Sequence, residues 1–117
     1  MTHSLIQNSR GFVRRGQELF CEEVSLHELA QQFGTPTYVY SRACIEHNYR
    51  LWDEALSGIH HQICYAMKAN SACGILQVLG RLGAGVDTVS GAEIARALRA
   101  GIKAEKIVFS GVGKTGR

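Results

Sequence analysis

The sequence predicts an α/β protein whose second half is built around a parallel sheet. Short apolar runs begin near residues 63, 86 and 107, and the segments between them carry apolar side chains at helical spacing. A repeat of about 22 residues suits βα units, in which parallel strands are joined by right-handed helical crossovers. The first half mixes strand and helix signals and is expected to be organised differently.

The composition limits the classes of function. Apolar residues make up 45% of the 117 residues and charged residues 20%, so the chain can bury a core. The net charge of +3 is scattered, and Arg14-Arg15 is too short a basic run to predict nucleic-acid binding. No apolar stretch approaches the roughly 20 residues of a membrane span. Four cysteines without a C-x-x-C pair, and no signal peptide, predict free thiols in the cytoplasm.

The first half predicts a hairpin followed by two helices. Residues 1–10 are polar and are expected to be flexible. Residues 12–24 predict a strand or hairpin, with turn residues at 15–17. Ser25 is a good N-cap, with Glu28 at the capping-box position of the first helix.

That first helix should end at Gly34, because Pro36 prevents its continuation. The β-branched and aromatic residues 37–40 predict a strand. Ser41 is then expected to cap a second helix that runs to about Leu56.

The second half predicts strand, helix, strand, helix, strand. Residues 63–67 are continuously apolar, as in a strand buried on both faces of a parallel sheet. The helix after it should bury Ile75, Leu76, Val78, Leu79 and Leu82. Residues 86–89 and 107–110 predict the other two strands, with a helix over 92–100 between them. Three such strands do not complete a barrel, so we expect Arg117 to be a truncation point.

Lys68 follows directly after the apolar run 63–67. It would therefore lie at the C-terminal end of a parallel strand, where α/β barrels place their chemistry. Apolar neighbours would lower the pKa of its amine and favour attack on a carbonyl group. From local sequence alone, a solvated lysine at the start of a loop is the favoured interpretation, because lysines are common at strand ends.

Asp87 lies within the second predicted strand, between Val86 and Thr88. A buried carboxylate needs a partner, because its burial alone is costly. Asp87 occupies the same register of its βα unit as Lys68, so both side chains could face one pocket. The alternative is a strand-end aspartate that caps the loop at residues 90–91.

Three further patterns are rejected as sites. The run 110–115 (SGVGKT) lacks the first glycine of a P-loop, since that position is Val108. The glycines at 83 and 85 precede a strand, whereas a dinucleotide loop follows one. No metal site is predicted, because no zinc spacing occurs among Cys44, His47, His60, His61 and Cys64.

Four blocks of the sequence carry a family resemblance. They are residues 33–40 (FGTPTYVY), 65–70 (YAMKAN), 82–93 (LGAGVDTVSGAE) and 106–115 (KIVFSGVGKT). In this order and spacing they resemble the diaminopimelate decarboxylases, which belong to the alanine-racemase-like, fold-type-III class of pyridoxal-phosphate enzymes. The resemblance covers nearly the whole chain from about Gly11.

The resemblance implies roles for four residues. Lys68 matches the lysine that bonds to pyridoxal 5'-phosphate and would be the catalytic residue. Asp87 matches an acidic position near the cofactor and that lysine. Ala66 and Ser90 match positions that line the same pocket. Met67 departs from the family, many of whose members have valine there, without loss of apolar character.

The resemblance also implies a fold: the first part of a (βα)8 TIM-like barrel, covering residues 37–117. Residues 11–36 would belong partly to a separate β domain. The phosphate-binding loop, the carboxylate facing the pyridine nitrogen, the stacking histidine, the substrate arginine and a cysteine from the partner subunit would all lie beyond Arg117. The 117 residues alone are therefore expected to be inactive.

The implied activity is decarboxylation of meso-2,6-diaminopimelate to L-lysine by a cytoplasmic homodimer. Two alternatives stay open. One is a decarboxylase of the same fold that acts on arginine, ornithine or carboxynorspermidine. The other is a non-catalytic regulator that binds pyridoxal 5'-phosphate.

Overall fold

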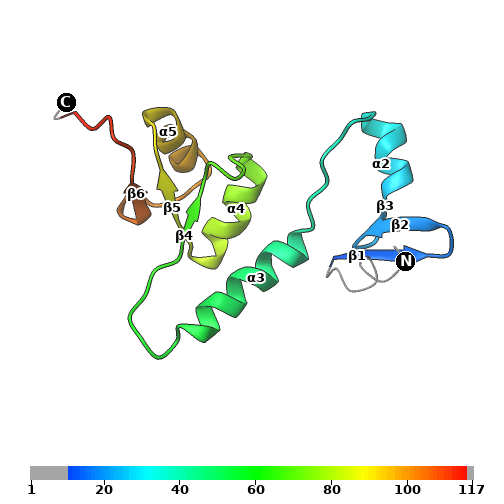
Figure 1. Cartoon of the computed structure of the whole chain (residues 1–117), viewed down its shortest axis with the longest axis horizontal. Coiled ribbons are helices and arrows are strands. Elements are labelled where there is room, and N and C mark those ends of the chain that lie inside the picture. Colours follow the sequence, from blue (N-terminus) through cyan, green and yellow to red (C-terminus); the bar gives the residue numbers. More distant parts are fainter. Residues whose placement is uncertain (1–10, 116–117) are drawn as a thin grey trace. The chain divides into compact units, whose positions relative to one another are not determined.

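A computed structural model describes residues 11–115, which fall into two compact units divided between Ile45 and Glu46 (Figure 1). Each unit is described by itself. The expectations of a flexible segment at 1–10 and of a truncation at Arg117 concern residues outside the described range.

The first unit begins with a small antiparallel sheet of order β1-β2-β3. Its strands are β1 (Phe12–Arg15), β2 (Glu18–Cys21) and β3 (Val24–Ser25). The turn between β1 and β2 contains Gly16, whose φ of 63° is a conformation that glycine adopts easily. The predicted hairpin and its turn are therefore confirmed.

Helix α2 (Leu26–Phe33) follows β3 directly. The Ser25 hydroxyl accepts a hydrogen bond from the Glu28 amide at 3.4 Å, so the predicted N-cap is confirmed. Gly34 ends the helix with a φ of 81° and donates its amide to the Ala30 carbonyl.

The strand predicted at residues 37–40 is wrong. The segment belongs to no sheet, and Tyr38 is 89% exposed. Aromatic and β-branched residues favour extended backbone, but a strand also needs a neighbouring ladder, and no described strand pairs with this segment. Helix α3 (Arg42–Ala55) then begins where predicted, because the Ser41 hydroxyl accepts a hydrogen bond from the Cys44 amide at 3.0 Å.

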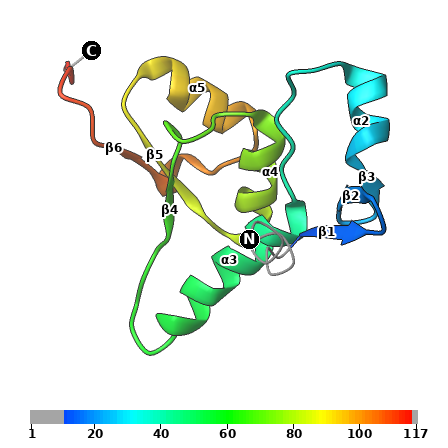
Figure 2. The same ribbon diagram turned by 45° about the vertical axis from the view of Figure 1, so that its right-hand side comes forward.

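The second unit contains a parallel sheet of order β4-β5-β6 with two crossover helices (Figure 2). Its strands are β4 (Cys64–Ala66), β5 (Gly85–Thr88) and β6 (Ile107–Phe109), and its helices are α4 (Cys73–Leu82) and α5 (Gly91–Arg99). A short 3₁₀ turn, η1 (Ala104–Lys106), leads into β6. The predicted α/β class and the parallel pairing of the strands are confirmed.

The core of this unit lies between the sheet and its helices. It consists of the buried side chains of Met67, Leu76, Val86, Ala97, Ala100 and Ile102, with Tyr65 and Ile107 packed against them. Tyr65, Val86 and Ile107 are register partners on the three strands, so they share one face of the sheet. Helices α4 and α5 cover this face and leave the other uncovered, so β4 is only partly buried and not buried on both faces as predicted.

The start of β5 also requires close backbone packing. A Cβ at Gly85 would collide with the Lys106 carbonyl oxygen, so no other residue fits there without a backbone shift.

Candidate functional site

The opposite face of the sheet carries a row of three residues. Ala66, Asp87 and Val108 are register partners on β4, β5 and β6. Because side chains alternate along a strand, this row points away from the face of Tyr65, Val86 and Ile107. Asp87 therefore lies at the centre of the face that α4 and α5 leave uncovered.

Asp87 carries an unsatisfied polar atom. Its Oδ1 is buried and has no hydrogen-bond partner among the described residues. An unpaired buried acceptor typically costs about 1–3 kcal/mol, more when it is charged. The sequence predicted that this carboxylate needs a partner, and residues 11–115 do not supply one to Oδ1. The position thus suits a ligand that presents a hydrogen-bond donor or a positive charge.

Lys68 directly follows Met67, which is hydrogen-bonded to the neighbouring strand at Asp87. The Met67 amide donates to the Asp87 carbonyl at 3.1 Å, and the Ala69 amide donates to the Ala66 carbonyl at 3.1 Å. The second bond closes a turn with Lys68 at its third position. The structure therefore brings Lys68, Ala66 and Asp87 to one edge of the sheet. Lys68 is exposed there, without the apolar surroundings expected from its strand.

The turn that follows Lys68 is held by two polar side chains. The Tyr65 hydroxyl donates to the Asn70 carbonyl at 3.0 Å. The Asn70 side-chain oxygen in turn accepts the Ala72 amide at 2.9 Å, which is an Asx-turn ahead of α4. Sequence reasoning missed both contacts, although an asparagine three residues before the helix was a usable signal.

Ser90 lies at the same edge, where α5 begins. Its hydroxyl accepts the Glu93 amide at 3.2 Å, and the Glu93 carboxylate accepts the Val89 amide at 2.7 Å. These reciprocal bonds fix the start of the helix. Ser90 thus has an N-cap contact in addition to any role toward a ligand, and its hydroxyl hydrogen stays available as a donor.

The other candidate patterns do not converge on a site. The described residues contain no group of three potential metal ligands, and His61 instead contacts the Ile59 carbonyl and Asp53 Oδ1, each at 3.0 Å. All four cysteines are free thiols. No helix within residues 11–115 is long and apolar enough to span a membrane.

An exposed primary amine at the same sheet edge as a buried, unpaired carboxylate oxygen is suited to binding an aldehyde-bearing group. The family described as pyridoxal-dependent decarboxylase, pyridoxal binding domain, matches residues 42–117. The chain belongs to this family. Pyridoxal-dependent decarboxylases use pyridoxal 5'-phosphate, so that cofactor follows from membership.

Individual relatives and solved structures of known name also match the chain. The diaminopimelate decarboxylase of Pseudomonas fluorescens is 62% identical over 104 residues, which are 89% of this chain and 25% of the relative. A solved structure from Aquifex aeolicus matches with a TM-score of 0.85 and 48% identity, covering 92% of this chain and 26% of that one. Diaminopimelate decarboxylase from M. jannaschii in complex with L-lysine matches with a TM-score of 0.84 and 36% identity, covering 91% and 26%. The chain thus spans about a quarter of the length of these relatives.

The residues present fit the family's cofactor. Lys68 supplies a primary amine, which reacts with an aldehyde, at the mouth of β4. Asp87 supplies a buried acceptor that a donor or a cationic nitrogen would satisfy.

Proposed function

We propose that the complete gene product is a diaminopimelate decarboxylase, which removes carbon dioxide from meso-2,6-diaminopimelate to give L-lysine. The observation that carries the proposal is the unpaired Asp87 Oδ1 inside a pyridoxal-binding domain. The Asp87 carbonyl accepts the amide of Met67, the residue directly before Lys68. The names of the relatives support the substrate, as does the L-lysine bound to the M. jannaschii enzyme.

In this proposal Lys68 is the catalytic residue that holds pyridoxal 5'-phosphate through its amine. When bound, the cofactor supplies an electron-withdrawing ring that accepts the electron pair left by departing carbon dioxide. Lys68 Nζ would also be placed to hold or move a proton in the pocket. Asp87 accepts a hydrogen bond from a nitrogen in the pocket and keeps positive charge near Lys68. Ala66 and Ser90 line the pocket.

The proposal extends to the arrangement of the whole protein. Residues 11–36 contribute to a separate β domain, and residues 37–117 begin a (βα)8 barrel. The protein acts as a homodimer in the cytoplasm, and residues 1–117 alone do not turn over substrate.

Borohydride reduction of the cofactor-loaded gene product, followed by peptide mass mapping, tests the role of Lys68. We expect the label on Lys68, and K68A should lower turnover on the order of a thousandfold or more, because no other group replaces the amine. K103A is the matched control, since Lys103 is an exposed lysine of the same unit with a side chain 73% exposed. Label on another residue would contradict the proposal.

Carbon dioxide release from a substrate panel tests the specificity. We expect meso-diaminopimelate to be the preferred substrate over arginine, ornithine and carboxynorspermidine. Preference for one of the last three would replace the proposed substrate. Cofactor absorbance without release from any of them would identify a non-catalytic regulator.

A further inference from the structure

Arg96 on α5 reaches across to the turn that follows Lys68. Its Nη1 lies 2.8 Å from the Ser71 hydroxyl oxygen and 3.4 Å from the Ser71 carbonyl oxygen, and it donates to both. Arg96 and Ser71 are 25 residues apart in the chain. The contact thus links the second βα unit to the turn of the first.

Arg96 adds to the hydrogen bonds that hold the short segment between Lys68 and α4. Tyr65 holds this segment at the Asn70 carbonyl from β4, and Asn70 itself holds the Ala72 amide. Arg96 holds Ser71 from the other side, from α5. A turn anchored from both a strand and a helix has less freedom than one anchored from the strand alone.

The same helix is fixed relative to Asp87. Its N-cap, Ser90, follows Asp87 by three residues, and the cap bonds with Glu93 set where α5 begins. Arg96 therefore connects the segment that follows Lys68 to the βα unit that carries Asp87. The parallel ladder between β4 and β5 also joins the two βα units, and it includes the bond from the Met67 amide to the Asp87 carbonyl.

We propose that Arg96 is a positioning residue for Lys68, which it keeps in place relative to Asp87 by clamping the turn at Ser71. The inference rests on the proposed function of Lys68. A lysine amine stands at the end of a flexible four-carbon stem, so its reach depends on where its backbone is anchored. A misplacement of about 1 Å in a reacting group can cost a hundredfold in rate.

Four variants of the complete gene product test the role. R96A removes the clamp, R96K keeps the charge but not the planar fork, and S71A removes one acceptor. R99A is the matched control, because Arg99 is an exposed arginine on the same helix. Three readouts are compared: amide hydrogen exchange at residues 69–72 without cofactor, the pH midpoint of the bound cofactor's visible absorbance, and kcat and KM.

We expect R96A to speed exchange at residues 69–72 by about tenfold, as expected when a local tie is lost. It should also move the absorbance midpoint and lower kcat by about three- to thirtyfold, with KM changed less than about twofold. R96K and S71A should fall between wild type and R96A, and R99A should match wild type. The double variant R96A/S71A should be no worse than R96A, since the two residues form one contact.

Equal exchange at residues 69–72 in R96A and R99A would overturn the proposal. Faster exchange in R96A with an unchanged absorbance midpoint and kcat would also overturn it, because the contact would then be structural only. Failure of the proposed function is recognised separately: the wild-type protein would carry the cofactor on a residue other than Lys68, and the positioning role would fall with it.

Discussion

The two units of the chain bury different kinds of side chain. In the second unit the buried cluster is apolar, with Met67, Leu76 and Val86 almost fully enclosed. Among residues 11–45 of the first unit, the buried residues are Cys21, Ser25 and Ser41, and both serines cap helices. One unit is thus organised by apolar packing, and the other largely by hydrogen bonds at helix ends.

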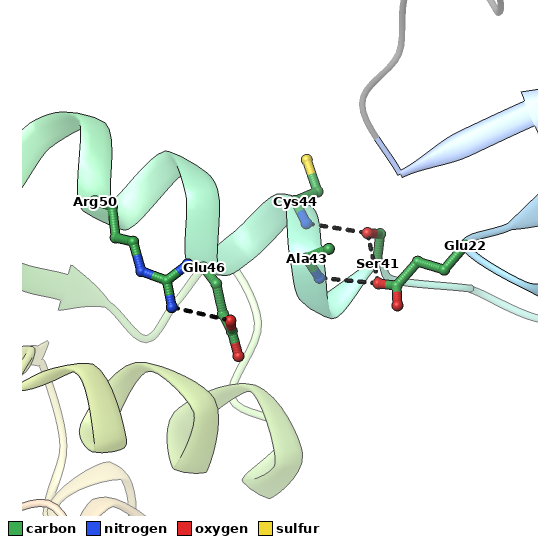
Figure 3. A network of polar contacts seen from close by, with 6 residues as sticks. All are labelled: Glu22, Ser41, Ala43, Cys44, Glu46 and Arg50. Atoms are coloured by element: carbon green, nitrogen blue, oxygen red, sulfur yellow. Dashed lines mark hydrogen bonds and ion pairs between the residues drawn. The ribbon is translucent and has the colours of Figure 1, made fainter.

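Glu22 shows how the polar arrangement works (Figure 3). Its Oε1 accepts hydrogen bonds from the Ser41 hydroxyl and the Ala43 amide, each at 2.9 Å, at the start of α3. A carboxylate is favourable there because free amides and the helix dipole present positive charge. The stability of the first unit should therefore depend mainly on charge and pH. The stability of the second unit should depend mainly on the volume of its buried side chains.

The largest expected effect is in the apolar cluster. L76A deletes a side chain that is 0% exposed, and we expect it to destabilise the second unit by about 2–5 kcal/mol through lost burial and a residual cavity. L98A is the matched control: Leu98 is 48% exposed, so its truncation should cost much less. Urea unfolding of both variants measures the difference. Equal losses would contradict the assignment of the core.

A smaller effect is expected at the polar cap of the first unit. E22A removes the acceptor for Ala43 and Ser41 and should cost about 0.5–1 kcal/mol, as other N-cap losses do at exposed sites. E23A is the control next to it, because Glu23 makes an exposed ion pair with Arg15 at 2.8 Å, and solvent-screened pairs of this kind contribute little to stability. Amide exchange at Ala43 should rise in E22A and not in E23A.

The smallest effects are pH dependences of opposite sign. Hydrogen bonds from Ala43 and Ser41 lower the pKa of Glu22 below its ordinary value. The contribution of Glu22 to the folding stability is therefore present above the ordinary glutamate pKa. It is lost as the pH falls through the lowered pKa. Carboxyl chemical shifts of Glu22 measured against pH test this, and a midpoint at the ordinary value would contradict it.

His61 in the second unit should behave in the reverse way. The Ile59 carbonyl and the Asp53 carboxylate raise the pKa of its imidazole. The contribution of His61 to the folding stability is present below the ordinary histidine pKa. It is lost as the pH rises through the raised pKa. Imidazole proton shifts follow this titration. D53N should move the midpoint down toward the ordinary value, and an unmoved midpoint would count against the contact.

Sequence reasoning succeeded where structure depends on local patterns. The apolar runs near residues 63, 86 and 107 formed parallel strands, because helices at the right spacing separate them. The caps at Ser25 and Ser41 also form, because each bonds an amide three residues along. The strand expected at 37–40 did not form, since pairing depends on a neighbour that local sequence does not specify.

The candidate site was predictable to the same extent. Register follows from parallel pairing, so the common edge of Lys68 and Asp87 could be expected from the sequence. The contact of Arg96 with Ser71 and that of Glu22 with Ser41 could not, because they join residues 25 and 19 positions apart with no local signature. Whether Asp87 Oδ1 has a donor was equally beyond the sequence, as it depends on every surrounding side chain.

The alternation along β5 restricts how this region can evolve. Val86 and Thr88 are buried on the core side, while Asp87 between them belongs to the opposite row with Ala66. Deletion or insertion of one residue within the strand would exchange the two faces, turning the carboxylate into the core and a valine toward the site. Descendants of this sequence can therefore vary β5 by substitution, while changes of length are confined to connecting segments such as residues 57–62.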